Sequence, residues 1–257
     1  MSTRVPSSAN IVTERRNGAF TFPFAYWVGM DTDPRTTPEA LAEFNQFYST
    51  THVGEVIAAH PGFVTASRYE LLDPDPRGGV HVGPRWLAVY EMKDEASAQQ
   101  YVKDNARPWL HRQKYSPWPP ARKRAKTVWR MLWRQIAAAG STDQPPESIF
   151  MVGMNVPADT DAQGLAEFNT FYTETHMPEV VAAGGYDRAT RFELYRDFAH
   201  PPPGCPRFCA IYEADAAATE ARESRRAARA PLSFGPATWE QRDTIWRLVY
   251  RRIPPPE

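Results

Sequence analysis

The sequence predicts an α+β protein that contains two tandem copies of one βαββαβ unit, and two observations support this prediction. First, one stretch occurs twice, as EFNQFYSTTHVGEV at residues 43–56 and as EFNTFYTETHMPEV at residues 167–180. Second, apolar segments of strand length and amphipathic segments of helix length follow the same order around both stretches. A repeat of this length indicates a duplicated supersecondary unit rather than a short solenoid module.

Each copy begins with a short apolar run, at residues 24–30 and 148–154, that is typical of a strand. A helix follows each run. Thr37 before Pro38 predicts the first helix N-terminus, because threonine caps helices and proline is favoured at the first helical position. We expect the second helix to begin near Asp161.

Glycine-containing pairs should end both helices, at Pro61-Gly62 and at Gly184-Gly185. Two strands, a polar alanine-rich helix and a last strand then follow in each copy. The expected strands cover residues 63–72, 85–91, 127–136, 186–195, 207–213 and 244–253, and the expected helices lie near 95–101 and 216–229. This order is that of the ferredoxin-like split unit.

The repeat divides the chain of 257 residues into two domains of ordinary size. We expect a flexible arm at residues 1–20, a first repeat at 21–139 and a second repeat at 148–257. A linker at 140–147, with the sequence GSTDQPPE, would join them.

Composition excludes several classes of protein. A hydrophobic content of 42% argues against disorder. Thirty basic and thirty acidic residues cancel, so the charge footprint of a nucleic-acid-binding protein is missing. No apolar stretch reaches membrane-spanning length, and residues 1–17 lack a hydrophobic signal core. We therefore expect a cytoplasmic protein without nucleic-acid or membrane partners, which could form a homodimer. Cys205 and Cys209 occur only in the second copy, so we expect neither a disulfide nor a metal site.

The last strand of each copy carries large apolar residues on one face, which two such sheets could bury against each other. They are Trp129, Met131 and Trp133 in the first copy, and Trp246, Leu248 and Tyr250 in the second. With this pattern, the FYxxTHxxEV motif and the following RYEL or RFEL, the chain resembles a tandem, single-chain member of the dimeric α+β barrel superfamily. Its first helix is similar to that of EthD-type and polyketide-cyclase-like members. The resemblance implies an intramolecular α+β barrel.

Candidate catalytic residues lie on the first helix of each copy. Tyr48, His52 and Glu55 are three or four residues apart and so share one helix face. An imidazole there could act as a general acid or base, with the glutamate holding its tautomer. Alternatively, the histidine only bonds a neighbouring carbonyl or carboxylate; the resemblance modestly favours the functional interpretation. The second copy contains the same set as Tyr172, His176 and Glu179.

Further residues could bind a substrate. Arg68 and Arg191 on the second strands would either join a structural network with Glu70 and Glu193 or line a pocket for an anion. Aromatic residues more often fill a core than contact a ligand, but some must line any cavity. The candidates are Trp86, Tyr90, Trp129, Trp133 and Trp246.

We therefore expect a cofactor-independent acid–base enzyme, a cyclase, isomerase or lyase, acting on a small aromatic or polyketide-like molecule in a barrel cavity. His52 or His176 would move the proton, and Tyr48 or Tyr172 would bind a developing oxyanion. The alternatives are a cofactor-free monooxygenase, a haem-binding barrel enzyme with a helix histidine as axial ligand, and a non-catalytic ligand-binding or stress-associated barrel. A pocket on which histidine and tyrosine converge would favour catalysis, whereas a filled interior would favour a structural role.

Overall fold

The computed structural model describes residues 20–73, 83–106, 115–141, 145–202, 204–217 and 231–254. The expected arm lies outside the described residues except for Phe20, and so does most of the expected helix at 216–229. The histidines at positions 81 and 111 also fall outside them.

Strands and helices recur in the same order in both halves of the chain. The first half contains β1 (Phe24–Asp31), α1 (Pro38–Phe47), η1 (Tyr48–His52), α2 (Val53–Ala59), β2 (Phe63–Asp73), β3 (Trp86–Met92), α3 (Glu95–Ala106), η2 (Pro120–Arg124) and β4 (Lys126–Gly140). The second half contains β5 (Ser148–Asn155), α4 (Ala162–Phe171), η3 (Tyr172–His176), α5 (Met177–Gly184), β6 (Arg188–Ala199), β7 (Phe208–Ala214), α8 (Ala237–Glu240) and β8 (Asp243–Ile253).

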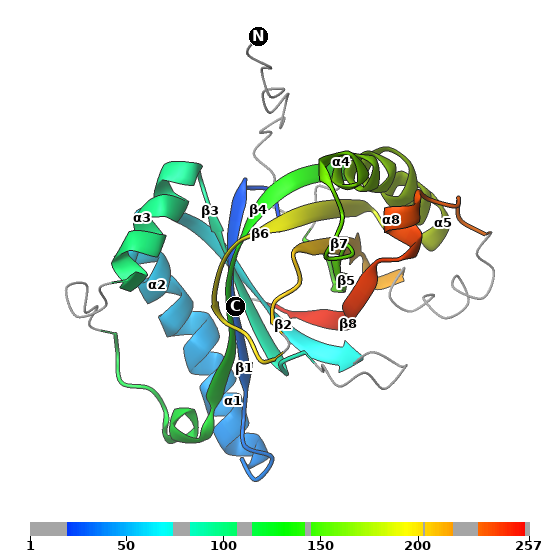
Figure 1. The fold of residues 1–257 in the computed structure, drawn as a ribbon. Helices are drawn as coiled ribbons and strands as arrows, with labels where there is room; N and C mark the ends of the chain where they lie inside the picture. The colour runs from blue at the N-terminus through cyan, green and yellow to red at the C-terminus, as the bar shows by residue number, and fades with distance from the viewer. Residues whose placement is uncertain are drawn as a thin grey trace.

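The strands form one closed antiparallel barrel in the order β1-β3-β2-β8-β5-β7-β6-β4. The pairs β2–β8 and β4–β6 join the two halves edge to edge. Helices of the first half cover one side of the barrel and helices of the second half cover the other (Figure 1). The α+β class and the barrel are therefore confirmed. Closure pairs the strand edges that an open sheet would expose.

Strand β4 is longer than predicted, because its pairing with β6 continues to the pair Gly140–Arg188. The sequence analysis ended this strand at residue 136 and assigned Gly140 to the linker. Gly140 has a positive φ of 74°, and a Cβ atom there would lie 2.3 Å from the carbonyl oxygen of Asp187. The last position of β4 therefore requires glycine.

Apolar side chains fill the middle of the barrel. The indole rings of Trp129 and Trp246 stack with centroids 5.2 Å apart, and those of Trp27 and Trp133 are 4.8 Å apart. All four are buried. Alternate residues of the same strands point outward and pack against the helices in two further apolar clusters, one for each half.

The predicted caps of the first helices are confirmed. The side chain of Thr37 accepts a hydrogen bond from the Ala40 N–H, and that of Asp161 accepts one from the Gly164 N–H. Gly185 ends α5 in the left-handed conformation, with φ 70°. The sequence analysis expected one continuous helix in each half, but π-helical segments, η1 and η3, interrupt both at the repeated motif.

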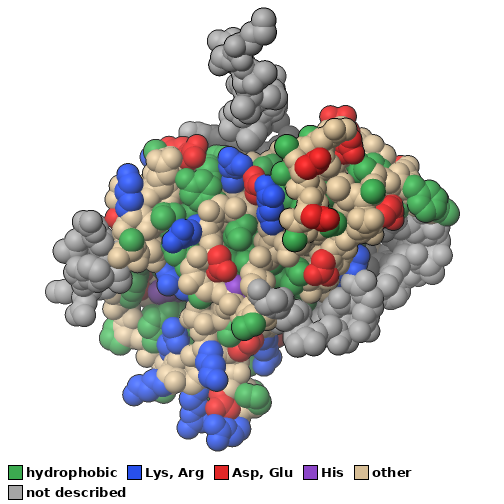
Figure 2. All heavy atoms as spheres, viewed as in Figure 1, with side chains coloured by type: hydrophobic (Ala, Val, Ile, Leu, Met, Phe, Trp, Pro, Cys, Tyr) green, Lys and Arg blue, Asp and Glu red, His purple; other side chains and the backbone are tan. Residues whose placement is uncertain are grey.

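On the visible face of the molecule, Lys and Arg side chains are more frequent at the left and bottom, and Asp and Glu side chains at the upper right (Figure 2). The basic run at residues 122–126 begins in the 3-10 helix η2, and its Lys123 and Arg124 are exposed. None of the described helices is long and apolar enough to span a membrane.

Candidate functional site

Each half places a tyrosine and a histidine in its π-helical segment, Tyr48 and His52 in η1 and Tyr172 and His176 in η3. Single π-helical turns inside α-helices occur frequently at functional sites. Both tyrosine side chains are buried against the outer face of the barrel. The helical spacing of the sequence did not reveal these turns, because a periodicity of 3.6 residues does not register one inserted residue.

Arg68 fastens the π-helical segment of the first half to the barrel. Its Nη1 donates hydrogen bonds to the Asn45 carbonyl oxygen (2.9 Å) and to Ser49 Oγ (2.8 Å), and its Nη2 donates one to Asn45 Oδ1 (2.7 Å). The guanidinium carbon lies 4.2 Å from the centroid of the Tyr48 ring, a cation–π geometry. Arg68 therefore holds the carboxyl end of α1 in place.

Arg191 makes the same contacts in the second half. Its guanidinium donates to the Asn169 carbonyl oxygen (3.1 Å), to Asn169 Oδ1 (2.9 Å) and to Thr173 Oγ1 (2.7 Å). It also lies 4.2 Å from the centroid of the Tyr172 ring. The sequence analysis gave a network of arginines with Glu70 and Glu193 as one interpretation. Arg68 and Arg191 do not take part in such a network, because both bind helix residues instead.

The glutamates of the second strands bind other arginines. Glu193 lies 2.7 Å from Arg134 and 3.2 Å from Arg207, and Glu70 lies 3.2 Å from Arg85. The arginines in these pairs are about half exposed. Exposed ion pairs of this kind contribute little to stability.

The buried guanidinium of Arg68 has an unusual electrostatic environment. Burial lowers the pKa of Arg68 to about 10, and the phenols of Tyr48 and Tyr90 oppose this effect. The side chain still carries its charge at neutral pH. In the described part of the chain it has no carboxylate partner, and its Nε has no hydrogen-bond partner. Burial likewise lowers the pKa of Arg191 to about 10.

The imidazole of His52 packs among aromatic rings. Its centroid lies 4.4 Å from that of Trp118, 5.1 Å from that of Tyr48 and 5.2 Å from that of Tyr115. Burial lowers the pKa of His52 to about 4, although the nearby Glu55 opposes this effect. His52 is therefore neutral at pH 7 and a weaker base than an exposed histidine. In the second half, the centroids of His176 and Trp239 are 4.3 Å apart.

The glutamates predicted to orient the histidines serve a different purpose. Glu55 Oε1 accepts hydrogen bonds from the Ser116 N–H (2.9 Å) and from Ser116 Oγ (2.5 Å). Its Oε2 lies 4.0 Å from Nδ1 of His52, beyond hydrogen-bond reach. Glu179 likewise accepts from the N–H and hydroxyl of Ser233. Both glutamates thus fix the segment that leads to the tryptophan covering the histidine.

The aromatic residues predicted to bind substrate do not converge on one site. Trp86 and Tyr90 lie on the outer face of the barrel among the helix contacts of the first half. In contrast, Trp129, Trp133 and Trp246 point into the barrel interior. The sheet therefore separates the two groups.

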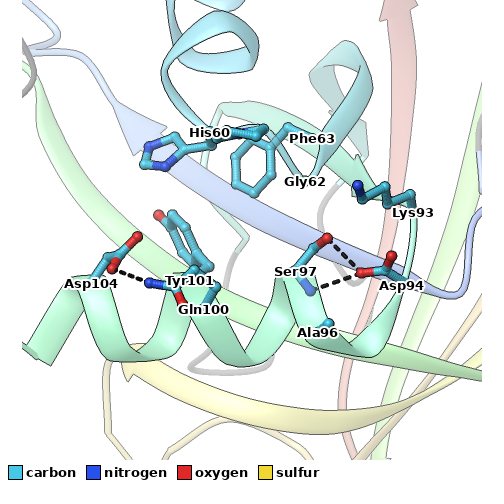
Figure 3. Close-up of a pocket in the computed structure, with 11 residues that line it drawn as sticks. His60, Gly62, Phe63, Lys93, Asp94, Ala96, Ser97, Gln100, Tyr101 and Asp104 are labelled. Atoms are coloured by element: carbon cyan, nitrogen blue, oxygen red, sulfur yellow. Dashed lines mark hydrogen bonds between the residues drawn. The ribbon is translucent and has the colours of Figure 1, made fainter.

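A cavity of about 240 Å³ lies in the first half, between the end of α2 and the exposed side of α3 (Figure 3). Three aromatic rings pack together on it: His60 lies 5.0 Å from Phe63 and 5.1 Å from Tyr101, centroid to centroid. Burial lowers the pKa of His60, and Asp104 opposes this. The cavity is lined by His60, Pro61, Gly62, Phe63, Lys93, Asp94, Ala96, Ser97, Gln100, Tyr101 and Asp104.

Sequence reasoning did not assign these residues to a site. His60 is the C-cap of α2, and the corresponding position of the second repeat is Gly184. This difference between the two copies was the sequence feature that could have pointed to the cavity. Gly62 is needed here, because a Cβ atom would lie 2.2 Å from Cβ of Ser97.

Comparison with known proteins gives structural similarities only. No protein-family model matches the chain, and no curated protein sequence matches it. A variant of the chlorite dismutase from Candidatus Nitrospira defluvii in complex with cyanide has 9% identity over 90% of both chains, with a TM-score of 0.48. The same enzyme in complex with imidazole has 9% identity, over 90% of this chain and 91% of that chain, with a TM-score of 0.48. A third protein, assigned as a chlorite dismutase, has 11% identity over 90% of this chain and 94% of that chain, also with a TM-score of 0.48.

The expectation of a cofactor-independent cyclase, isomerase or lyase is wrong. The similar structures reported above are chlorite dismutases, and none of them is a cyclase, isomerase or lyase by its name. Tryptophans fill the barrel interior, and neither His52 nor His176 lines the described cavity.

The described residues do not fit a haem. An axial histidine needs an open apolar slot beside its imidazole, but the rings of Trp118 and Trp239 lie against His52 and His176. The cavity beside His60 is smaller than the range of about 300–1,000 Å³ usual for ligand pockets. Among the residues described, no group of three or more His, Cys, Asp or Glu side chains could hold a metal ion.

Proposed function

We propose that the protein is a barrel that binds a small aromatic molecule without a cofactor and without catalysis, in the cavity beside His60. The observation that carries this proposal is the cavity itself, of about 240 Å³, with three aromatic rings on its wall. An enclosed apolar cavity of about 150 Å³ is known to hold benzene. The cavity beside His60 is large enough for one substituted ring and is partly open to solvent, because Ala96 and Gln100 on its wall are exposed.

Polar groups around the rings would orient such a ligand. Ser97 donates both its N–H and its hydroxyl to Asp94 Oδ1, at 2.8 and 2.5 Å, and Gln100 donates to Asp104 Oδ1 at 2.7 Å (Figure 3). These bonds fix the α3 face that borders the cavity. Polar groups placed beside aromatic rings are typical of small-molecule sites.

The probe is 4-fluorophenol, followed by fluorine NMR with the full-length chain. Ala96 lines the cavity and is exposed, so Ala96→Trp should fill the site without disturbing α3. Gln99, on the same helix but outside the cavity, supplies the control Gln99→Trp. We expect the wild type and Gln99→Trp to bind the probe, and Ala96→Trp to bind at least tenfold more weakly. Absence of binding to the wild type, or equal binding to both variants, would contradict the proposal.

We also propose that the two halves are tandem ferredoxin-like repeats, at residues 21–139 and 148–257, of an EthD-type group. What supports this is the repeated motif and the matching η1 and η3 segments, each held by a buried arginine. Separate expression of each half would test the domain bounds.

A further inference from the structure

A buried carboxylate at one end of the barrel binds the chain that precedes β1. Glu91 Oε1 accepts a hydrogen bond from the Phe20 N–H (2.8 Å), and Oε2 accepts from the Thr21 N–H (2.6 Å) and the Phe22 N–H (2.9 Å). Glu91 is 1% exposed. Three N–H groups converge on this one buried side chain and satisfy both of its oxygens, so Glu91 holds three successive peptide groups in place.

The other half of the protein binds the same segment. Arg188, at the start of β6, donates a hydrogen bond from Nη2 to the carbonyl oxygen of Phe20 (2.7 Å). Arg188 is itself buried, 3.7 Å from Glu213 Oε1. The donor and acceptor groups of one residue, Phe20, are thus recognised by side chains from opposite halves of the barrel.

The side chain of Phe20 completes the contact. It is fully buried, with its ring centroid 6.3 Å from that of Tyr69 and 6.0 Å from that of Phe192. Phe20 also has a φ of 61°, the only positive value at a non-glycine residue in the described ranges. A bulky residue adopts this conformation only where surrounding contacts compensate its cost.

The same end of the barrel retains polar atoms that this segment does not use. Arg188 Nη1 is buried, and no residue that the structure describes forms a hydrogen bond with it; the same holds for Thr190 Oγ1 and Gln135 Oε1. Thr190 lies two residues after Arg188 and so faces the same side of β6. Buried polar groups in native proteins normally have partners, so these atoms indicate capacity for further contacts.

We propose that this end of the barrel is a peptide-binding site, which recognises an aromatic side chain and three successive backbone N–H groups, and that residues 20–22 are its intramolecular ligand. The site uses none of the residues that line the cavity beside His60 and does not depend on the proposed function. It selects against proline at any of the three positions, because proline lacks the N–H that Glu91 binds.

The experiment uses the full-length chain with Phe20→Ala and Thr21→Pro together, which remove the aromatic ring and one N–H from the internal ligand. The probe is a fluorescent peptide with the sequence of residues 18–23, GAFTFP, with blocked ends. Its control is the same peptide with alanine for the first phenylalanine. Fluorescence anisotropy measures binding, and circular dichroism verifies the fold.

We expect the double variant to bind the GAFTFP peptide at least tenfold more tightly than the wild type does, because the wild-type site is already occupied. The control peptide should bind the double variant at least tenfold more weakly. A folded double variant that binds neither peptide, or both equally, would overturn the proposal. If the double variant does not fold, the single variant Phe20→Ala is tested with the same two peptides, and the same results would support or overturn the proposal.

Discussion

Replacing Glu91 by glutamine should change how the stability of the protein depends on pH. Burial raises the pKa of Glu91 to about 7, and the N–H groups of residues 20–22 and the guanidinium of Arg188 oppose this effect. The usual pKa of a glutamate is about 4.3. The folded protein therefore binds a proton on Glu91 more tightly than the unfolded chain does.

The sign follows from this difference. Below about pH 4, the Glu91 carboxyl group is protonated in both the folded and the unfolded protein. The contribution of this group to the free energy of unfolding is then at its maximum. As pH rises to 7, only the unfolded chain releases the proton freely, so the free energy of unfolding falls. The difference between pKa values of about 4.3 and about 7 corresponds to about 4 kcal/mol in all, of which about 3 kcal/mol is lost between pH 5 and pH 8.

Glutamine abolishes this titration at a constant cost. Its amide oxygen can face two of the three backbone N–H groups, but its NH₂ group then opposes the third. An unsatisfied buried donor costs about 1–3 kcal/mol at every pH. We expect Glu91→Gln to be less stable than the wild type at pH 5, and the difference to shrink or reverse at pH 8 by about 3 kcal/mol.

Urea denaturation of both proteins at pH 5 and pH 8 measures this change. His52 also titrates differently in the folded protein, with its pKa lowered to about 4, but this effect is common to both proteins and cancels in the difference. Burial raises the pKa of Tyr69, near this end of the barrel, so its phenol stays protonated at both pH values. If the stability difference is the same at both pH values, Glu91 does not titrate as the structure indicates.

Two further predictions concern packing and can be measured by urea denaturation. Arg68→Met should lower the free energy of unfolding by about 3 kcal/mol, because it removes three hydrogen bonds that a buried charged group makes. Arg85→Met, at a half-exposed arginine, should lower it by less than about 1 kcal/mol. Equal losses would refute a special role for Arg68. Gly54→Ala should raise the free energy of unfolding by about 0.5–1 kcal/mol, because residue 54 lies in a helix and its new Cβ would meet no atom within 4 Å. Gly62→Ala should lower it, because the new Cβ would collide with Ser97. If Gly62→Ala is as stable as the wild type, α3 can shift away from residue 62.

The sequence predicted the features of this protein that depend on local chemistry. The internal repeat gave the two halves, and the alternation of apolar residues gave the strands. The Thr37 and Asp161 caps lie where they were expected, because a capping side chain bonds an N–H group only three residues away. The inward position of the last-strand tryptophans followed from the alternation of side chains along a strand.

The candidate site was predicted only in part. The motif placed Tyr48 beside His52, but the structure shows that Glu55 binds Ser116 and that Trp118 covers the imidazole. These partners come from a segment about sixty residues away, and no periodicity connects the two. The cavity beside His60 depends likewise on how α3 packs against the end of α2.

Tertiary structure alone decided how the halves are joined and what they enclose. The closing pairs β2–β8 and β4–β6 link strands from different repeats, which the sequence would equally allow to stack as separate sheets. Glu91 and Phe20 are 71 residues apart, yet they form one buried contact. A hydrogen bond of this kind depends on the closed barrel to exclude water and bring both groups together, and local sequence carries no record of that geometry.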